Sequence, residues 1–372
     1  SDLMADPKPR NLGGSLPVPN VQDLAGRPDE LTLTPTLLRR YVRPQPNTAD
    51  LRPDAPAGEE QEHVPIIDLG RLLGPDDLAG GRDEEAARLR SACEDWGFFQ
   101  VVNHGIPEET LEEMKRNVMG FFALPLAEKA AFAQRPGEIE GYGQAFVVSE
   151  EQTLDWADMF FLLTQPPSYR DLRLWPSNPS TFKNCLENYS AEVQRVAGEL
   201  LGAMAENLGV RDHSDMTRLA ASQSVRMNYY PPCPEAHVDS VLGLSPHSDA
   251  VGLTLLLQVS KVPGLQIRRK GGWVPVTPLP GALVVNVGDV IEVFTNGKYR
   301  SVEHRAVVNA RHERMSIATF HSGKFGTMYG PLEEAVGDEE PRYRSISVEE
   351  YVKLVVSSKL DGKNIMDAMK ID

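Results

Sequence analysis

The stretch between residues 226 and 320 decides the fold. It opens with RMNYYPPCP (226–234), continues with HSDAVGLTLLLQ (247–258) and closes with RMSIATF (314–320). Between these segments, short apolar runs alternate with glycine, proline and asparagine turns, at 265–267, 273–276, 282–287 and 306–308. Many short strands after a helical first half are typical of a barrel-like antiparallel sandwich, a jelly roll of the cupin kind.

Polar side chains recur at every second position in three of these segments. Because successive strand residues point to opposite faces, positions two apart share a face. The sets that share a face are Arg226, Asn228 and Tyr230; His247 and Asp249, if that segment is extended; and Arg314, Ser316, Ala318 and Phe320. Polar groups that point inward from apolar strands are costly to bury unless they bind something, so these sets predict a ligand site.

Two histidines and one aspartate in this stretch have the chemistry of a metal site. His247, Asp249 and His304 offer two imidazoles and a carboxylate, a set that leaves coordination positions open for non-heme Fe(II) and O2. Arg314 has a planar, always charged guanidinium that is suited to gripping the far carboxylate of an organic acid. We therefore predict an iron site with an adjoining site for a 2-oxo acid.

The pattern His-x-Asp is a weak signal by itself, because it occurs at 213–215, 237–239 and 247–249. The first occurrence lies in a polar stretch that is typical of a loop ending in a helix N-cap. The second directly follows a proline-rich turn. Only His247 leads within a few residues into a continuous apolar strand, which places the predicted metal at the third occurrence.

Further motifs lie outside this stretch or overlap it. They are VPIID (64–68), WGFFQVVNHG (96–105), DWAD (155–158), NYYPPCP (228–234), HSD (247–249), NG (296–297) and RMS (314–316). With these motifs, the region from Val64 to the C-terminus resembles the soluble plant Fe(II)/2-oxoglutarate-dependent dioxygenases. The resemblance is to the branch that holds anthocyanidin synthase, flavonol synthase and the alkaloid O-demethylases.

The resemblance implies a role for several residues. His247, Asp249 and His304 would ligate Fe(II), and Arg314 and Ser316 would bind the distal carboxylate of 2-oxoglutarate. The other implied site residues are Tyr230 and Asn228 for the co-substrate, and Tyr142, Phe146, Arg226 and Phe320 for the substrate.

The resemblance also implies an activity. The enzyme would hydroxylate, O-demethylate or desaturate a small, largely apolar plant specialised metabolite, with O2 as oxidant and ascorbate as reductant. The oxidation would be coupled to decarboxylation of 2-oxoglutarate to succinate and CO2. Two alternatives remain open at this point: an iron oxidase that does not need 2-oxoglutarate, and a non-catalytic, cupin-like binding protein.

The chain divides into four expected regions, which together predict an α+β fold. Residues 1–60 would form an N-terminal arm with a tag remnant at 1–3, and 61–220 a mainly helical region. Residues 221–325 would form the double-stranded β-helix (jelly-roll) core, and 326–372 a C-terminal helix that acts as a lid over the barrel.

Apolar periodicity predicts the main helices of these regions. Expected helices cover 83–96, a segment from Pro107, the long stretch from Pro179 to Gly209, and 348–360. Strands are expected at 64–69 and 98–102, and the NG pair at 296–297 is typical of a hairpin turn.

Composition excludes several classes of function. Of the 372 residues, 41% are hydrophobic and 24% charged, with a net charge of -15, as in ordinary globular proteins. Without a long basic run, nucleic acid and anionic membranes are not expected as partners. Three cysteines without zinc spacing favour reduced thiols. With no secretory signal or transmembrane run visible, a cytoplasmic monomer is expected.

Overall fold

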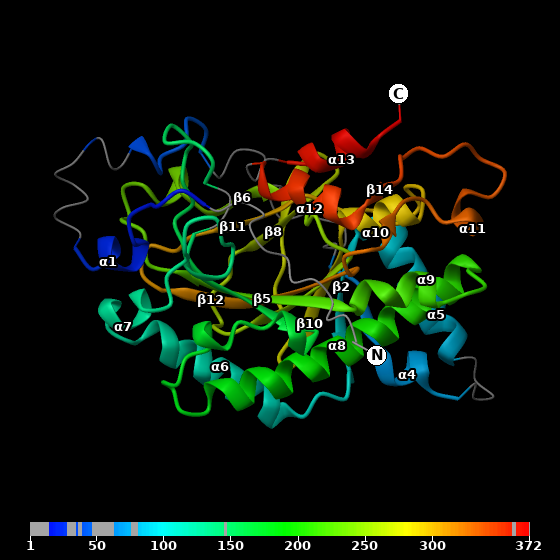
Figure 1. Ribbon diagram of the computed structural model, residues 1–372, viewed down its shortest axis with the longest axis horizontal. Coiled ribbons are helices and arrows are strands. Elements are labelled where there is room, and N and C mark those ends of the chain that lie inside the picture. The colour runs from blue at the N-terminus through cyan, green and yellow to red at the C-terminus, as the bar shows by residue number, and fades with distance from the viewer. Residues whose placement is uncertain are drawn as a thin grey trace, which may run out of the picture.

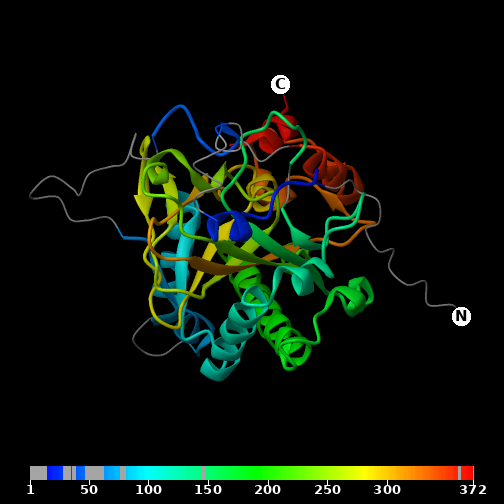
Figure 2. The same cartoon turned by 90° about the vertical axis from the view of Figure 1, so that its left-hand side faces the viewer.

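The computed structural model describes residues 15–27, 35, 39–46, 63–75, 81–144, 147–358 and 362–371. Two sheets face each other, and long helices cover the outer face of the larger sheet (Figures 1 and 2). This arrangement confirms the predicted α+β fold with a jelly-roll core. Within the described ranges, no helix combines the length and the apolar character needed to cross a membrane.

The larger sheet draws its strands from both halves of the chain. Its first two strands are parallel, and the other neighbours are antiparallel. In spatial order the sheet contains β1 (Ile66–Asp68), β2 (Phe98–Val102), β10 (Leu283–Val287), β7 (Leu253–Gln258), β12 (Arg314–Ser322), β5 (Ser222–Tyr230), β4 (Asp158–Gln165) and β3 (Gly141–Gly143). The predicted strands at 64–69 and 98–102 are thus present. The exact borders of the four expected regions stay a prediction.

The smaller sheet lies over the inner face of the larger one. It contains β6 (Leu242–His247), β11 (His304–Val307), β8 (Leu265–Arg269) and β9 (Gly272–Pro275), all antiparallel. A separate pair, β13 (Met328–Tyr329) and β14 (Ile346–Ser347), follows the jelly roll.

Helix α8 (Phe182–Leu208) is the main support of the larger sheet. Its apolar stripe is buried against the sheet and against α6 (Glu108–Phe122), with Leu186, Val193 and Leu200 fully covered. The helix ends at Gly209, whose φ of 71° closes the last turn in the left-handed region that glycine favours. Both helices therefore match the sequence expectation, and Figure 2 shows them below the sheet.

The remaining helices are shorter. They are α1 (Val21–Ala25), α4 (Leu69–Leu73), α5 (Gly81–Ser91), a π-helical turn (Ala92–Trp96), α7 (Leu126–Ala130), α9 (Ser214–Thr217), α10 (Asp289–Phe294), α11 (Glu333–Val336), α12 (Val348–Val356) and α13 (Asn364–Met369). Short 3-10 turns cover Pro167–Tyr169, Leu172–Leu174, Arg218–Ala220 and Val238–Ser240.

Three local expectations are wrong. The NG pair at 296–297 does not connect two strands: it follows α10, and Gly297 donates its backbone N–H to Glu292 at the end of that helix (2.8 Å). The segment from His247 to Asp249 is not extended, as the shared strand face would require, because His247 ends β6 and Asp249 lies in the loop before the predicted strand β7. The last helix ends at Val356, and α13 is an additional helix.

The described parts of the N-terminal arm pack on the main body, as expected. Val21, Leu24 and Tyr41 are buried beside Trp156 of the DWAD motif, with the Tyr41 and Trp156 rings edge to face at 5.2 Å. The carboxylate of Asp158, the last residue of this motif, accepts the backbone N–H groups of Val21 (2.9 Å) and Gln22 (2.8 Å). The DWAD motif therefore anchors the arm.

This anchor makes stability depend on pH. Burial raises the pKa of Asp158 from 3.8 to about 6. Between these values the folded protein holds a proton that the unfolded chain has lost, so the carboxyl's contribution to stability is complete below pH 3.8. It is lost as the pH rises to about 6.

We expect wild type to lose stability, relative to an Asp158→Asn variant, as the pH rises from 4.5 to 6.5. The loss is about 3 kcal/mol between pH 3.8 and 6, of which about 2 kcal/mol falls in the range that is measured. The melting temperatures of both proteins measure it. A difference in melting temperature that stays constant across this range would contradict the assignment.

Candidate active site

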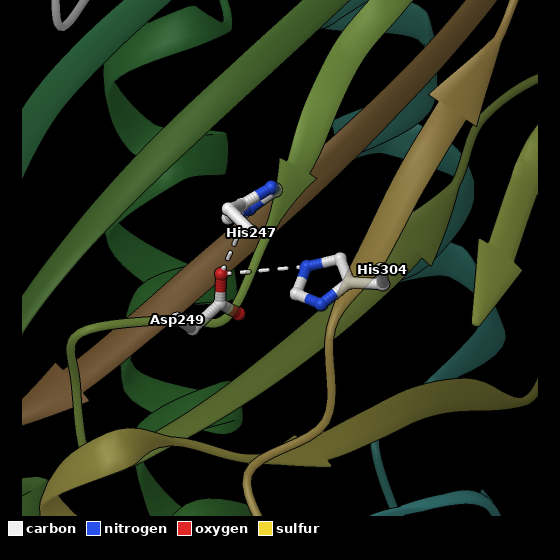
Figure 3. Close-up of side chains that lie close together, drawn as sticks. All are labelled: His247, Asp249 and His304. Carbon is white, nitrogen blue, oxygen red and sulfur yellow. Dashed lines mark ion pairs between the residues drawn. The ribbon is translucent and has the colours of Figure 1, made fainter. Parts of the chain in front are cut away.

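Neighbouring strands bring the two predicted histidine ligands together. His247 of β6 and His304 of β11 are direct partners in the smaller sheet, and their rings lie 4.3 Å apart between centroids. The loop after β6 turns Asp249 toward them. Its Oδ1 atom lies 3.2 Å from Nε2 of His247 and 3.4 Å from Nε2 of His304 (Figure 3).

Hydrogen bonds behind these side chains orient them. Nδ1 of His247 lies 2.7 Å from the carbonyl of Ser245, and Nδ1 of His304 lies 3.2 Å from the carbonyl of Val302. Because a carbonyl only accepts, each Nδ1 carries a proton and donates it to its carbonyl, and each Nε2 points toward Asp249. Such outer partners fix the tautomer of histidines that bind metals.

The aspartate is oriented in the same way. Its Oδ2 atom accepts hydrogen bonds from Oγ1 of Thr254 (2.7 Å) and Nδ2 of Asn286 (2.8 Å). These two donors lie on β7 and β10 of the larger sheet. Oδ1 therefore remains available on the side of the histidines, and both sheets contribute to its position.

Burial and charge set the protonation states of the three ligands. Burial and the nearby His304 lower the pKa of His247, which favours the neutral imidazole. Burial alone would raise the pKa of Asp249, but the charge of His304 and hydrogen bonds from both histidines hold it well below its usual value. Burial acts to lower the pKa of His304, but the Asp249 carboxylate, together with weaker nearby groups, has the opposite and larger effect, so the pKa of His304 is raised.

This donor set fits one divalent cation. The ligand atoms of His247, Asp249 and His304 lie within 4.8 Å of one another, and all three residues are buried. Two neutral imidazoles and one carboxylate, with other positions open, suit non-heme Fe(II). The orienting hydrogen bonds are those that such a site requires.

Arg314 provides a buried positive charge on the neighbouring strand β12. It is 3% exposed, and its Nε atom has no hydrogen-bond partner within the described residues. Nη2 contacts Oε1 of Gln258 (3.3 Å), and the guanidinium lies 5.3 Å from the centre of the Tyr230 ring. Burial lowers the pKa of this arginine. In the part of the chain that the structure describes, this guanidinium is paired only with neutral groups, and a buried charge of this kind is suited to binding an anion.

Gly264 makes room for this arginine. A Cβ atom at this position would lie 2.6 Å from Cδ and 2.7 Å from Nε of Arg314. Real atoms do not approach so closely, so any larger residue would displace the guanidinium. The absence of a side chain at Gly264 is thus part of the proposed anion site.

The polar row on β5 lies beside Arg314, as the alternation predicted. Tyr230 pairs with Arg314 and Asn228 with Ser316 in the register of the two strands. Asn228 donates to Oγ of Ser316 (3.3 Å) and accepts from Nε of Arg226 (2.8 Å). The opposite residues of β5 are buried on the helix side of the sheet, so each face of this strand has its own function.

Nine of the eleven predicted site residues line one cavity between the sheets: Arg226, Asn228, Tyr230, His247, Asp249, His304, Arg314, Ser316 and Phe320. Tyr142 lies elsewhere. It is buried among Phe121 and Phe122 at the far edge of the larger sheet, and its hydroxyl accepts a hydrogen bond from Asn20 (2.5 Å). Phe146 lies outside the described residues.

Several supporting residues were not found from the sequence. Thr254 and Asn286, which donate hydrogen bonds to Asp249, occur in apolar runs. A single polar residue within each run was the only sign in the sequence of this role. Asp155 of the DWAD motif accepts from Oγ of Ser245 (2.5 Å) and from Arg43 of the arm (2.9 Å). The motif therefore reaches the backbone that orients His247.

Removal of a ligand should abolish metal binding. We expect His247→Ala to lose Fe(II) binding with little change in fold, because two donors alone hold the ion weakly. His237→Ala, a control from another His-x-Asp pair, should bind Fe(II) like wild type, since His237 lies in a turn outside the cavity. Anaerobic titration and circular dichroism measure both. Loss of binding in His237→Ala alone would refute the choice of ligands.

Loss of the Arg314 guanidinium should weaken binding of 2-oxoglutarate. Each hydrogen bond to a charged group contributes about 1.5–3 kcal/mol, so Arg314→Ala should raise the KM for 2-oxoglutarate by well over tenfold. Arg314→Lys should recover only part, because an ammonium cannot hold two oxygens in a planar fork. An unchanged KM in the alanine variant would remove Arg314 from the site.

Comparison with known proteins agrees with this geometry. Residues 64–178 match the family described as non-haem dioxygenase in morphine synthesis N-terminal, and residues 221–323 match the 2OG-Fe(II) oxygenase superfamily. The chain is 48% identical over 360 residues to S-norcoclaurine synthase 1 of Coptis japonica, covering 97% of this chain and 98% of that protein.

Two further relatives are informative. Oxoglutarate-dependent flavonoid 7-O-demethylase 1 of Ocimum basilicum is 44% identical over 363 residues, which cover 97% of this chain and 93% of the relative. The crystal structure of JOX2 in complex with 2OG, Fe and JA matches with a TM-score of 0.82 and 34% identity, covering 96% and 99% of the two chains. The chain belongs to the 2OG-Fe(II) oxygenase superfamily and is a 2-oxoglutarate-dependent dioxygenase that uses iron.

Proposed function

We propose that this dioxygenase oxidises a C–H bond of a small, largely apolar plant specialised metabolite. The supporting observation is the composition of the cavity wall around the iron ligands. Beyond the polar row on β5 and β12, the wall is formed mainly by apolar side chains: Phe98, Leu244, Leu256, Leu265, Ala306, Ala318 and Phe320. Such a wall favours an apolar ligand, and a few polar groups orient it.

The β12 register supports a division of the cavity into two parts. Arg314 and Ser316 lie toward one end, where they would bind the distal carboxylate of 2-oxoglutarate. Phe320 lies toward the other and pairs with Thr254, whose hydroxyl holds the iron ligand Asp249. Phe320 is therefore well placed to contact a substrate beside the iron.

Arg226 would orient one polar group of the substrate. It lines the cavity and pairs in register with Ala318. Nε donates to Asn228, and the guanidinium has no ion pair with a carboxylate in the described part of the chain. A hydroxyl, carbonyl or carboxylate of the metabolite could accept from its remaining N–H groups.

The protein groups have distinct tasks in the reaction. Bound iron supplies activation of O2, coupled to conversion of 2-oxoglutarate to succinate and CO2 while one oxygen atom enters the substrate C–H bond. Arg314 and Ser316 would fix the co-substrate, and Arg226 and Phe320 the substrate. The apolar wall limits access of water to the reacting atoms.

O-demethylation is one outcome of the same step. Hydroxylation of an O-methyl carbon gives a hemiacetal, which releases formaldehyde and leaves a hydroxyl group. Thebaine 6-O-demethylase and codeine O-demethylase of Papaver somniferum are 41% and 42% identical to this chain. Because of these relatives, O-methylated alkaloids and flavonoids are the first substrates to test. Hydroxylation and desaturation are the other outcomes to look for.

The test is incubation with a panel of O-methylated and unmethylated metabolites, Fe(II), 2-oxoglutarate and ascorbate. We expect oxidised product, detected by mass spectrometry, together with an equal amount of succinate. His247→Ala is the inactive control. Product without 2-oxoglutarate would favour an iron oxidase that does not need the co-substrate. Wild-type binding of metabolites without any turnover would favour a binding protein.

Truncation of Phe320 should separate the two parts of the cavity. We expect Phe320→Ala to raise the KM for the metabolite by at least tenfold, since Phe320 is only half-buried in the protein itself and a phenylalanine side chain that a ligand covers contributes about 1.5–3 kcal/mol. The KM for 2-oxoglutarate should change little. Equal losses for both ligands with a lower melting temperature would indicate a core phenylalanine instead.

Other sequence expectations stay predictions: a cytoplasmic location, a monomeric state, and no partnership with nucleic acid or membranes. The lid also stays a prediction. Tyr351 of α12 packs edge to face on Tyr329 of β13, with ring centres 5.1 Å apart. The described residues that line the cavity do not include α12.

A further inference from the structure

The segment that follows α12 contacts the loop that carries two of the iron ligands. The backbone N–H of Gly362 donates to the carbonyl of Pro246 (2.9 Å), and the N–H of Ser248 donates to the carbonyl of Gly362 (3.0 Å). Gly362 therefore pairs with His247 like a short added strand. Because these bonds lie on both sides of His247, the C-terminal segment fixes the backbone of this ligand.

The next residue, Lys363, connects the same segment to α10. Its Nζ atom donates to Oε2 of Glu292 (2.8 Å) and to the carbonyl of Ser301. Oε2 of Glu292 also accepts the backbone N–H of Ser301 (2.6 Å). Both charged side chains are largely covered, with 29% of Lys363 and 14% of Glu292 exposed. One ion pair thus joins three segments that are distant in sequence.

The connection continues to the other two ligands. Oγ of Ser301 donates to Oδ1 of Asp289 (2.6 Å), and Ser301 lies three residues before His304. The backbone N–H of Asp289 donates to the carbonyl of Asp249 (2.8 Å). Each iron ligand is therefore linked to the Lys363–Glu292 pair by a short series of contacts: His247 through Gly362, Asp249 through Asp289 and Ser301, and His304 through the chain that begins at Ser301.

We propose that Lys363 is a positioning residue for the iron site, acting through Glu292. Its ammonium closes a connection between the C-terminal segment, α10 and the strand that begins at His304. Without it, the C-terminal segment loses its ion pair with Glu292, and the three ligands become less well ordered. This proposal concerns iron binding and is independent of which metabolite is oxidised.

The test compares two lysine-to-methionine variants of the full chain. Lys363→Met removes the ammonium and keeps an unbranched side chain. Lys370→Met is the matched control, because Lys370 lies in the same C-terminal segment but pairs with Asp367 at the surface (2.8 Å; 56% and 68% exposed). Affinity is measured by anaerobic titration with Fe(II), and ligand geometry by the visible absorption spectrum with Co(II) in its place.

We expect Lys363→Met to weaken Fe(II) binding by about tenfold. This is the low end of the effect of losing a group bonded directly to a metal ligand, because Lys363 acts through Glu292 and Ser301. The Co(II) spectrum of Lys363→Met should differ from that of wild type. Lys370→Met should match wild type in both measurements, and Lys363→Arg should recover most of the affinity. Wild-type affinity and spectrum in Lys363→Met, even with a lower melting temperature, would overturn the proposal.

A second pair of variants tests the route through Glu292 and covers the case of a poorly folding Lys363→Met. Tyr343 donates its hydroxyl to the second oxygen of Glu292 (3.1 Å). Glu292→Gln removes the charge and keeps one side-chain oxygen, which can still accept the backbone N–H of Ser301, while the new NH2 group can donate to the Tyr343 hydroxyl. We expect it to weaken Fe(II) binding as well, and Lys363→Met should add little further loss in that background. Full, independent losses in the double variant would show that Lys363 does not act through Glu292.

Discussion

The site depends on one constraint: three ligand side chains from β6, its following loop and β11 must converge in a largely buried space. The ionised carboxylate of Asp249 lies between two buried imidazoles. Burying such a group is costly, and Thr254 and Asn286 offset part of the cost by donating to its second oxygen. The larger sheet therefore orients Asp249, a ligand that follows a strand of the smaller sheet.

The strands were predictable where alternation was strict. The β5 and β12 pattern placed Asn228, Tyr230, Arg314 and Ser316 on one face, and the observed register pairs them there. The three metal ligands were predictable from residue chemistry, although the local structure around His247 and Asp249 was not. Asp249 shares a side with His247 because a loop turns it back, a tertiary effect that alternation does not contain.

Predictions without a strict period failed for identifiable reasons. The NG pair has both residues at positive φ, as a hairpin turn would. In the structure, however, this pair directly follows α10 and terminates that helix instead of connecting two strands. Tyr142 follows a flexible glycine, and only tertiary contacts reveal that its ring joins the Phe121 cluster. Gly362 contacts the loop of the metal ligands across more than a hundred residues of sequence, and Lys363 contacts Glu292 and Ser301 across 71 and 62 residues. The local sequence does not indicate such contacts.

The register of strand β12 also fixes a distance in the active site, and this distance can change only in large steps. The register sets the distance between the proposed carboxylate anchor at Arg314 and the level of Thr254, which holds an iron ligand. A strand keeps the same face only if it slips by two residues, or roughly 6.6 Å. Such a step far exceeds one carbon–carbon bond. Evolution toward a longer or shorter 2-oxo acid would therefore have to exchange the anchoring side chain, because the sheet itself cannot be adjusted that finely.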